Sequence, residues 1–402
     1  MRKLTVLGST GSIGCSTLDV LRSRRDDFEV FALVAGRNAE LLAQQVAEFR
    51  PQVAVVATEA DREHLIEKLV ETGMAKSAWP QLEFGPRARV GAATAAEVDF
   101  VMSAIVGVAG LEATYEAVRL GKTVGLANKE VLVASGKLVT EAARAAGTEL
   151  IPVDSEHNGV HQCLRGGRRS EVARIILTAS GGPFRKTPKE LLDKVTPEQA
   201  LNHPTWKMGK RITIDSATMM NKGFEVIEAC WLFGVSPSEV EIVVHPQSSL
   251  HAMVEYSDGS VLAQISATDM RMPIQYALTY PAREAAPVPR LDWRQARLWE
   301  FEPPDMEKFR LLALAYQAQE TGGSAPCTLN AADEVAVEAF LRGNVPFTGI
   351  ADVVEETLAR VPVRQARSVE EVLQIDEESR AVAMEIVNRS RTANTARPVG
   401  AV

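Results

Sequence analysis

Cysteine is scarce in this chain and follows no pattern. Its four cysteines, Cys15, Cys163, Cys230 and Cys327, lie far apart with no paired spacing. Because disulfide frameworks and zinc sites place cysteines at characteristic close spacings, the sequence indicates neither. Reduced thiols are typical of cytoplasmic proteins, so we expect a cytoplasmic location.

The chain also lacks a long apolar run and a basic excess. No apolar stretch reaches the roughly 18 residues that a membrane-spanning helix needs. The apolar run 4–7, after Arg2 and Lys3, is too short for a secretory signal. Its 44 Lys and Arg stand against 52 Asp and Glu, a formal net charge of -8, without basic clusters. We therefore expect neither nucleic acid nor a membrane as a partner.

The composition of the 402 residues is that of a globular protein, with 46% hydrophobic and 24% charged residues. A length of roughly 100–200 residues per domain suggests about two to four domains. We find no internal repeat and no low-complexity segment.

Strand and helix patterns alternate over the first 150 residues. Crossover helices between strands imply a parallel sheet, so we predict a doubly wound, Rossmann-like α/β domain over 1–153. The expected strands are 4–8, 30–36, 52–57, 98–104, 123–127 and 149–153.

After residue 154 the pattern changes to that of an α+β catalytic and connective domain, over 154–280. Asp258-Gly259 predicts a hairpin, and we expect an antiparallel sheet. The expected strands here are 172–179, 212–214, 241–245, 251–256 and 260–265, with helices at 189–200 and 218–233.

Prolines mark the next stretch, 281–305, as a connecting arm. Helical periodicity then predicts a C-terminal helical bundle over 306–392, and 393–402 has the composition of a tail.

The segment 8–14, GSTGSIG, leaves a predicted strand and enters a predicted helix. Glycines there allow a tight turn and let backbone N–H groups approach a pyrophosphate. The spacing departs from the usual G-x-G-x-x-G, and a purely structural turn is the alternative. A P-loop is excluded, because no Gly-Lys-Ser/Thr follows.

The end of the second expected strand indicates which nicotinamide cofactor binds. An NAD site places Asp or Glu there, whereas this chain has Gly36-Arg37-Asn38. A guanidinium suits a 2′-phosphate, so we expect NADPH. The alternative is that Arg37 is an ordinary surface residue.

Two further motifs follow expected parallel strands. Ligands of open α/β sheets bind outside such strand ends, which makes LANKE (126–130) and PVDSEHN (152–158) candidate sites. In extended backbone, Asp154 and Glu156 point to the same side and suit Mg²⁺ or Mn²⁺. The alternatives are a helix start with Glu130 in its first turn, and a helix N-cap at 154–155.

The segment 215–225, DSATMMNKGFE, runs into a predicted helix. Spacings of three and four residues place Asn221, Lys222 and Glu225 on one helix face. Glu225 is then a candidate third metal ligand, and Lys222 and Asn221 suit an anionic substrate. A surface Lys–Glu pair is the alternative.

Two smaller features complete the candidates. Ser180-Gly181-Gly182 suits a phosphate cradle, and 203–209 (HPTWKMG) suits a mobile lid or, alternatively, a plain surface loop. We expect His245 and His251 to be structural.

Together these motifs resemble those of the 1-deoxy-D-xylulose 5-phosphate reductoisomerases, over nearly the full chain. Seven motifs occur in order: GSTGSIG, LANKE, PVDSEHN, SGGPF, HPTWKMG, DSATMMNKGFE and HPQS. The resemblance implies reduction and isomerisation of a sugar phosphate in the non-mevalonate isoprenoid pathway, NADPH, a divalent ion (Mg²⁺, Mn²⁺ or Co²⁺) and a homodimer.

The resemblance also implies residue roles. It places NADPH at Thr10, Gly11, Ser12, Ile13, Gly36, Arg37, Asn38, Asn128, Glu130 and Gly209. It places the metal ion on Asp154, Glu156 and Glu225. It places the sugar phosphate at Lys129, Ser155, Glu156, Ser180, His203, Ser216, Asn221, Lys222 and Glu225, under a lid with Trp206 and Met208. Lys129, His203 and the three carboxylates are the expected catalytic residues.

Two other functions remain open on the residues alone. A metal-free NADP dehydrogenase, acting on a semialdehyde or homoserine, would leave the carboxylates unexplained. An NADPH-sensing regulatory protein would bind cofactor without oxidising it.

Overall fold

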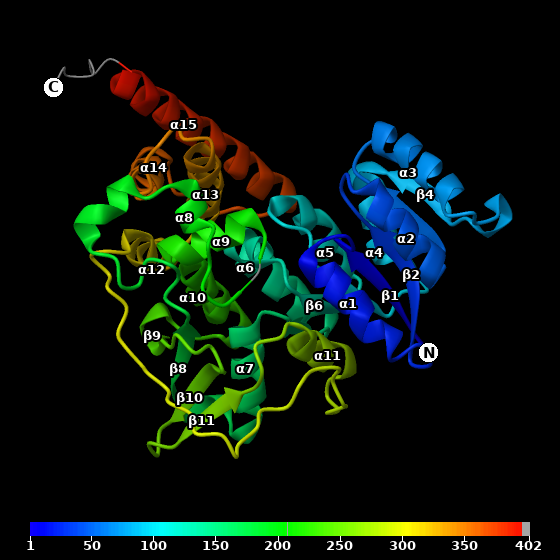
Figure 1. Cartoon of the computed structure of the whole chain (residues 1–402), viewed down its shortest axis with the longest axis horizontal. Coiled ribbons are helices and arrows are strands. Elements are labelled where there is room, and N and C mark those ends of the chain that lie inside the picture. The colour runs from blue at the N-terminus through cyan, green and yellow to red at the C-terminus, as the bar shows by residue number, and fades with distance from the viewer. Residues whose placement is uncertain (207, 396–402) are drawn as a thin grey trace. The chain divides into compact units, whose positions relative to one another are not determined.

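A computed structural model describes residues 1–206 and 208–395, with no side chains beyond 390 (Figure 1). Residues 396–402 of the expected tail, and Lys207 of the expected lid, lie outside the described residues. The described chain forms two compact units. The first comprises Met1–Val131, Lys137–Gln162 and Ile265–Arg294, and the second comprises Leu132–Gly136, Cys163–Gln264 and the chain from Gln295 onward. The linear division into 1–153, 154–280, 281–305 and 306–392 stays a prediction.

The first unit contains the expected parallel sheet. Its order is β4-β3-β2-β1-β5-β6-β7, with β1 paired to both β2 and β5. The sequence moves outward from β1 to β4 and then resumes at β5 on the other side, as in a doubly wound fold. The strands are β1 (Arg2–Leu7), β2 (Phe28–Val34), β3 (Val53–Val56), β4 (Gln81–Phe84), β5 (Phe100–Ser103), β6 (Thr123–Leu126) and β7 (Leu150–Pro152).

Strand β4 was not expected from the sequence. Gln81–Phe84 lies at the sheet edge and has no fully buried residue. It therefore lacks the apolar pattern by which a strand is recognised.

Helices connect the strands of the first unit and bury its core. Fully buried Leu4, Leu18, Leu42 and Phe100 belong to one apolar cluster of strand and helix side chains. The helices are α1 (Ser12–Arg22), α2 (Ala39–Phe49), α3 (Glu59–Glu71), α4 (Gly85–Thr94), α5 (Leu111–Arg119), α6 (Lys129–Ala146), α7 (Ser155–Cys163) and α11 (Arg271–Thr279).

Helix α11 returns to the first unit from a distant part of the sequence. It packs against α1, and Arg271 Nη1 lies 2.8 Å from Asp19 Oδ2. Ile274 and Leu278 join the core of the parallel sheet. No sequence pattern predicted this helix, which follows the second sheet and precedes the proline-rich stretch.

The second unit contains a four-stranded sheet in the order β11-β10-β8-β9. The expectation of an antiparallel sheet was wrong in one respect, because β8 and β9 are parallel. Helices connect these two strands and reverse the chain, so a parallel pairing is possible. The strands are β8 (Val172–Ala179), β9 (Val240–Val244), β10 (Leu250–Tyr256) and β11 (Val261–Ile265).

The predicted hairpin joins β10 and β11. Gly259 has a positive φ of 84°. Tyr256 N donates to Ser260 O over 2.9 Å, and Gly259 N donates to Tyr256 O over 2.9 Å.

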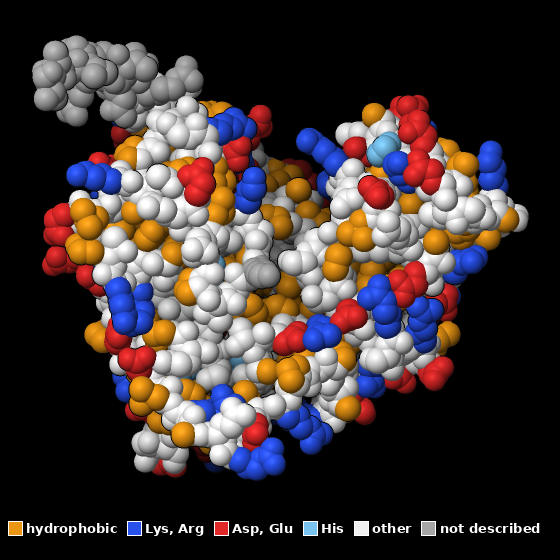
Figure 2. Space-filling model, in the orientation of Figure 1, with side chains coloured by type: hydrophobic (Ala, Val, Ile, Leu, Met, Phe, Trp, Pro, Cys, Tyr) orange, Lys and Arg blue, Asp and Glu red, His pale blue; other side chains and the backbone are white. Residues whose placement is uncertain are grey.

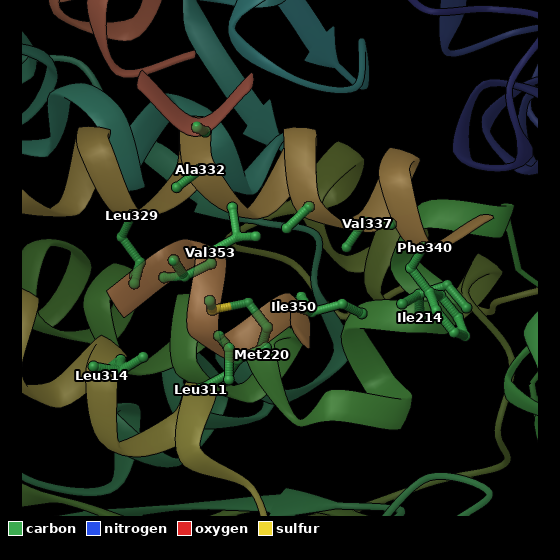
Figure 3. Close-up of a cluster of buried hydrophobic side chains, with 14 of the residues drawn as sticks. Ile214, Met220, Leu311, Leu314, Leu329, Ala332, Val337, Phe340, Ile350 and Val353 are labelled. Atoms are coloured by element: carbon green, nitrogen blue, oxygen red, sulfur yellow. The ribbon is translucent and has the colours of Figure 1, made fainter. Parts of the chain in front are cut away.

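The helices of the second unit pack around their own core, shown in Figure 3. Leu311, Leu329, Phe340 and Ile350 are buried together there. The helices are α8 (Pro197–Ala200), α9 (Lys210–Thr218), α10 (Met220–Phe233), α12 (Arg310–Thr321), α13 (Ala325–Leu341), α14 (Gly349–Arg360) and α15 (Val369–Thr395).

Helix α9 replaces the strand that we expected at 212–214. Thr213, Ile214, Ala217 and Thr218 are buried, a spacing that fits one face of a helix. Ile214 packs into the core in Figure 3. Packing of this face overrides the β propensity of the Ile-Thr-Ile run.

None of the helices in the described residues is long and apolar enough to cross a membrane. Figure 2 shows acidic and basic side chains interspersed over the visible face.

Candidate active site

The glycine-rich segment forms a tight turn between β1 and α1. Gly8 N and Ser9 N each donate to Val34 O over 2.8 Å, and Gly8 has a φ of 89°. A Cβ on Gly14 would lie 2.3 Å from Gly8 O, so the start of α1 can approach the turn only without a side chain. Gly11 precedes α1 and no side chain caps the helix. Its first N–H groups can therefore meet a phosphate.

Residues 36–38 lie at the end of the neighbouring strand β2. Gly36, Arg37 and Asn38 are exposed, and a Cβ on Gly36 would meet nothing within 4 Å. Asn38 Oδ1 accepts from Leu41 N over 3.1 Å and caps α2. Arg37 thus stands beside the glycine turn, at the same edge of the sheet.

The LANKE segment ends β6 and starts α6, so the alternative of a helix start is correct for its backbone. Asn128 precedes the helix, and its Nδ2 donates to Gly107 O over 3.1 Å. Asn128 is 2% exposed, and its Oδ1 has no hydrogen-bond partner among the described residues. A buried acceptor without a donor favours a ligand that supplies one.

Lys129 and Glu130 are both buried in the first turn of α6. Lys129 Nζ forms an ion pair with Asp154 Oδ2, from the end of β7. The strand order β5-β6-β7 brings these two residues together, although 25 positions separate them.

Asp154 and Glu156 do not lie on extended backbone. Helix α7 starts at Ser155, and Asp154 Oδ1 accepts from Glu156 N over 3.2 Å and from His157 N over 3.4 Å. Asp154 is thus a helix N-cap, as the alternative stated. One oxygen of Asp154 and one of Glu156 nevertheless lie within 4.8 Å of each other. Two carboxylates this close favour a cation between them.

Glu225, in the second unit, is fully buried on α10 and is engaged by its own helix. Asn221 Nδ2 donates to Glu225 Oε1 over 2.6 Å, and Lys222 Nζ pairs with Glu225 Oε2. The expected shared face is confirmed, and the pair is not on the surface, because Lys222 is 4% exposed. A carboxylate has about four acceptor sites, so Glu225 can accept more than these two contacts.

Ser180 and His203 form a second polar group of this unit. His203 Nδ1 accepts from Thr205 N over 3.1 Å and from Trp206 N over 2.9 Å. His203 Nε2 therefore carries the proton and donates to Ser180 Oγ over 3.0 Å. Burial lowers the pKa of His203, which is consistent with the neutral ring.

A cavity of about 800 Å³ lies beside this group. Ser180, His203, Arg185 and Lys194 line it, so cationic side chains face it together with hydroxyl and imidazole groups. Gly182 has a φ of 64°, and a Cβ there would lie 2.6 Å from Ser216 O. The glycine thus lets the turn after β8 approach α9.

The remaining predicted residues of the second unit lie on the segment that enters α9. Gly209 precedes the helix without a side-chain cap, and Ser216 Oγ donates to Ile212 O over 2.9 Å. Trp206 and Met208 are half-buried.

Sequence reasoning missed two supporting residues. Buried His157 has its Nδ1 3.6 Å from Asp154 Oδ1. Its place in the first turn of α7, three residues after Asp154, could have indicated this contact. Gln45, 5% exposed on α2, donates through Nε2 to Ser9 O over 2.9 Å. No local pattern marks that contact, because 36 positions separate the residues.

His245 is fully buried, as expected of a structural histidine. Its Nδ1 lies 3.1 Å from Glu300 O, and its ring stacks on Phe301 at 4.9 Å.

The fold and the turn define the class of this protein. It is a dinucleotide-binding α/β protein whose sheet edge also carries paired carboxylates and a buried lysine.

Comparison with known proteins specifies the family. Residues 4–136 match the family model of 1-deoxy-D-xylulose 5-phosphate reductoisomerase, 150–233 match its C-terminal domain, and 265–382 match the DXP reductoisomerase C-terminal domain. The enzyme of this name from Solibacter usitatus is 66% identical over 395 residues, 98% of this chain and 99% of its own. The enzyme of this name from Ralstonia nicotianae is 51% identical over 94% of this chain and 96% of its own. The chain belongs to the 1-deoxy-D-xylulose 5-phosphate reductoisomerase family.

Solved structures agree in fold. The reductoisomerase from Zymomonas mobilis in complex with NADPH has a TM-score of 0.89 and 46% identity, over 96% of this chain and 99% of its own. A DOX-P reductoisomerase in complex with NADPH, fosmidomycin and magnesium has a TM-score of 0.89 and 36% identity, over 96% of this chain and 98% of its own.

Proposed function

We propose that this chain converts 1-deoxy-D-xylulose 5-phosphate to 2-C-methyl-D-erythritol 4-phosphate, with NADPH and a divalent metal ion. The observation that carries the proposal is the pair of Asp154 and Glu156, with Lys129 beside it, on the sheet edge that also holds the glycine turn. The substrate is inferred from the family to which the chain belongs.

The residues present fit NADPH. Gly8 and Gly14 let the backbone of the turn pack closely, so that the uncapped first N–H groups of α1 are open to a pyrophosphate. Exposed Arg37 suits a 2′-phosphate. The unpartnered Oδ1 of Asn128 suits the amide N–H of a nicotinamide. We assign the adenosine end to 36–38, the pyrophosphate to 10–13, and the nicotinamide end to Asn128, Glu130 and Gly209.

The residues also fit a divalent cation. Asp154 and Glu156 supply oxygen ligands that Mg²⁺, Mn²⁺ and Co²⁺ accept, and we assign Glu225 as the third ligand. Lys129 and Lys222 neutralise part of the negative charge of these carboxylates.

We assign the phosphate of the substrate to Ser180 and His203. Ser180 Oγ accepts from His203 Nε2 and from Gly182 N, so its hydroxyl hydrogen can be donated to a phosphate oxygen. Arg185 and Lys194 add positive charge to the same cavity. The hydroxyl groups of the sugar are assigned to Lys129, Ser155, Ser216, Asn221 and Lys222.

The reaction moves a carbon–carbon bond and then reduces the resulting branched aldehyde. The bound cation would supply Lewis acidity to the carbonyl and hydroxyl oxygens, and NADPH would supply the hydride. Lys129 and Lys222 hold positive charge at the carboxylates and can orient substrate oxygens. Trp206 and Met208 would cover the substrate and exclude water.

An assay of NADPH oxidation with the purified chain tests the proposal. We expect turnover of 1-deoxy-D-xylulose 5-phosphate with Mn²⁺ and none after chelation, restored when Mn²⁺ returns. Glu225→Gln should lower kcat by about 100-fold or more, because it removes a metal ligand.

The exposed Glu338→Gln, on α13, is the matched control and should retain activity. Full turnover in chelator, or an unchanged rate for Glu225→Gln, would instead favour a metal-free dehydrogenase. Cofactor binding without oxidation would favour a regulatory protein.

The proposal includes a homodimer in the cytoplasm. Strand β11 ends the second sheet, and its Val261 and Leu262 are 47% and 40% exposed. An edge strand with apolar side chains favours pairing with another chain. Light scattering should give twice the chain mass, and Leu262→Lys should shift the protein toward the monomer.

A further inference from the structure

A cluster of charged side chains joins three helices of the second unit, and none of its members has a role in the proposed reaction. We call it the α9–α13–α15 cluster. Its members are Arg211 and Asp215 on α9, Asp333 and Glu334 on α13, and Asp376 and Arg380 on α15.

Both arginines of the cluster bind carboxylates other than Asp333. Arg211 Nη1 donates to Glu334 Oε1 over 2.7 Å. Arg380 Nη2 donates to Glu334 Oε2 over 2.6 Å, and its Nε donates to Asp376 Oδ2 over 2.6 Å. Charge-assisted hydrogen bonds therefore join Glu334 to both arginines and Asp376 to Arg380. Burial nevertheless raises the pKa of Asp376.

Asp333 is in a different situation. It is fully buried, and Arg211 Nη2 lies 3.8 Å from its Oδ2, beyond hydrogen-bond length. Asp215, 4% exposed, faces it, and Arg211 Nε lies 3.7 Å from Asp215 Oδ2. Asp333 thus lies beside Asp215 without a hydrogen bond from either arginine of the cluster.

A proton between the two carboxyls supplies the hydrogen-bond donor that Asp333 lacks. While both carboxyls are ionised, no described group donates a hydrogen bond to either oxygen of Asp333. Protonation of one carboxyl creates a donor between them. Burial, and then the neighbouring charge of Asp215, hold the pKa of Asp333 well above its usual range.

We propose that Asp333 is a positioning residue that carries a proton in the folded protein and thereby anchors Asp215, and with it helix α9, to the helical bundle. Helix α9 follows Gly209 and carries Ser216 directly after Asp215. Both are assigned to ligands, so the consequence for activity rests on the proposed function. The consequence for stability does not.

The stability effect has a definite sign. A carboxyl whose folded pKa is raised binds its proton more tightly when folded than when unfolded. The folded state therefore loses stability as pH rises above the unfolded pKa, about 3.9, toward the folded pKa. An asparagine keeps the donor and has no proton to lose.

Thermal unfolding without ligands tests this inference. Asp333→Asn should have a Tm at or above that of the wild type at neutral pH, and the difference should grow as pH rises above the unfolded pKa of about 3.9. Asp333→Ala, which removes the donor, should lower Tm by about 5 °C. Glu334→Gln is the matched control: it weakens two charge-assisted bonds and should lower Tm.

Kinetics test the positioning role. Asp333→Asn should keep the wild-type KM for the sugar phosphate at neutral pH, whereas Asp333→Ala should raise KM several-fold through Ser216. If the chain turned over no sugar phosphate, the Tm measurements would still decide the protonation state. A Tm of Asp333→Asn below wild type across the pH range would overturn the inference, and equal KM values for Asn and Ala would overturn the positioning role.

Discussion

Arg37 shows how one residue can set cofactor choice. Its guanidinium is exposed just after β2, beside the glycine turn. Arg37→Asp should repel a 2′-phosphate and accept the ribose hydroxyls, shifting the ratio of kcat/KM for NADPH over NADH by about tenfold or more. The exposed Arg87→Asp, on α4, controls for net charge. An unchanged ratio would contradict the assignment.

His203 predicts a pH dependence. Its folded pKa is lowered by burial, so the neutral ring is stabilised, and this contribution is lost as pH falls below about 6.5 through the folded pKa. His203→Asn should keep an acceptor for Thr205 N and Trp206 N but lose the contact to Ser180. We expect Tm to change little and KM for the sugar phosphate to rise about tenfold. In the wild type, this protonation should decrease Tm as pH falls below about 6.5. The variant should not show this decrease, and a variant that still shows it would exclude His203 as the cause.

At the scale of elements, close approach explains the glycine turn. A Cβ on Gly14 would push α1 away from Gly8 O, so Gly14→Ala should weaken NADPH binding by tenfold or more. Gly91→Ala, on α4, is the matched control, because a Cβ there meets nothing within 4 Å. Calorimetric titration with NADPH measures both. Equal affinities of the two variants for NADPH would show that the close contact between Gly14 and Gly8 O is not needed for binding.

The elements also show where sequence patterns succeed. The buried parallel strands around β1 follow apolar runs, and the predictions there are confirmed. Short or edge elements such as β4 carry no such pattern, and α9 carries a misleading one. For Asp154 and Glu130 the alternative interpretation of a helix start is correct, and each residue still lies at a candidate site.

For the whole molecule, ligand binding should be visible in stability. A ligand that binds only the folded state raises Tm by mass action. We expect NADPH and Mn²⁺ each to raise Tm, and Glu225→Gln to lose the Mn²⁺ increment while keeping the NADPH increment. Thermal scans of both proteins with each ligand measure this. Loss of both increments would indicate misfolding rather than a lost metal ligand.

The sequence alone determined the doubly wound sheet, the helical C-terminal region and the candidate residues, because apolar periodicity and short motifs are local properties. It also placed Asn221, Lys222 and Glu225 on one face, which follows from helical spacing. Only the tertiary structure paired Lys129 with Asp154, brought Gln45 to Ser9 and buried Asp333 opposite Asp215. Each of these contacts joins residues far apart in the chain, and the burial of Asp333, which raises its pKa, depends on every element packed around it.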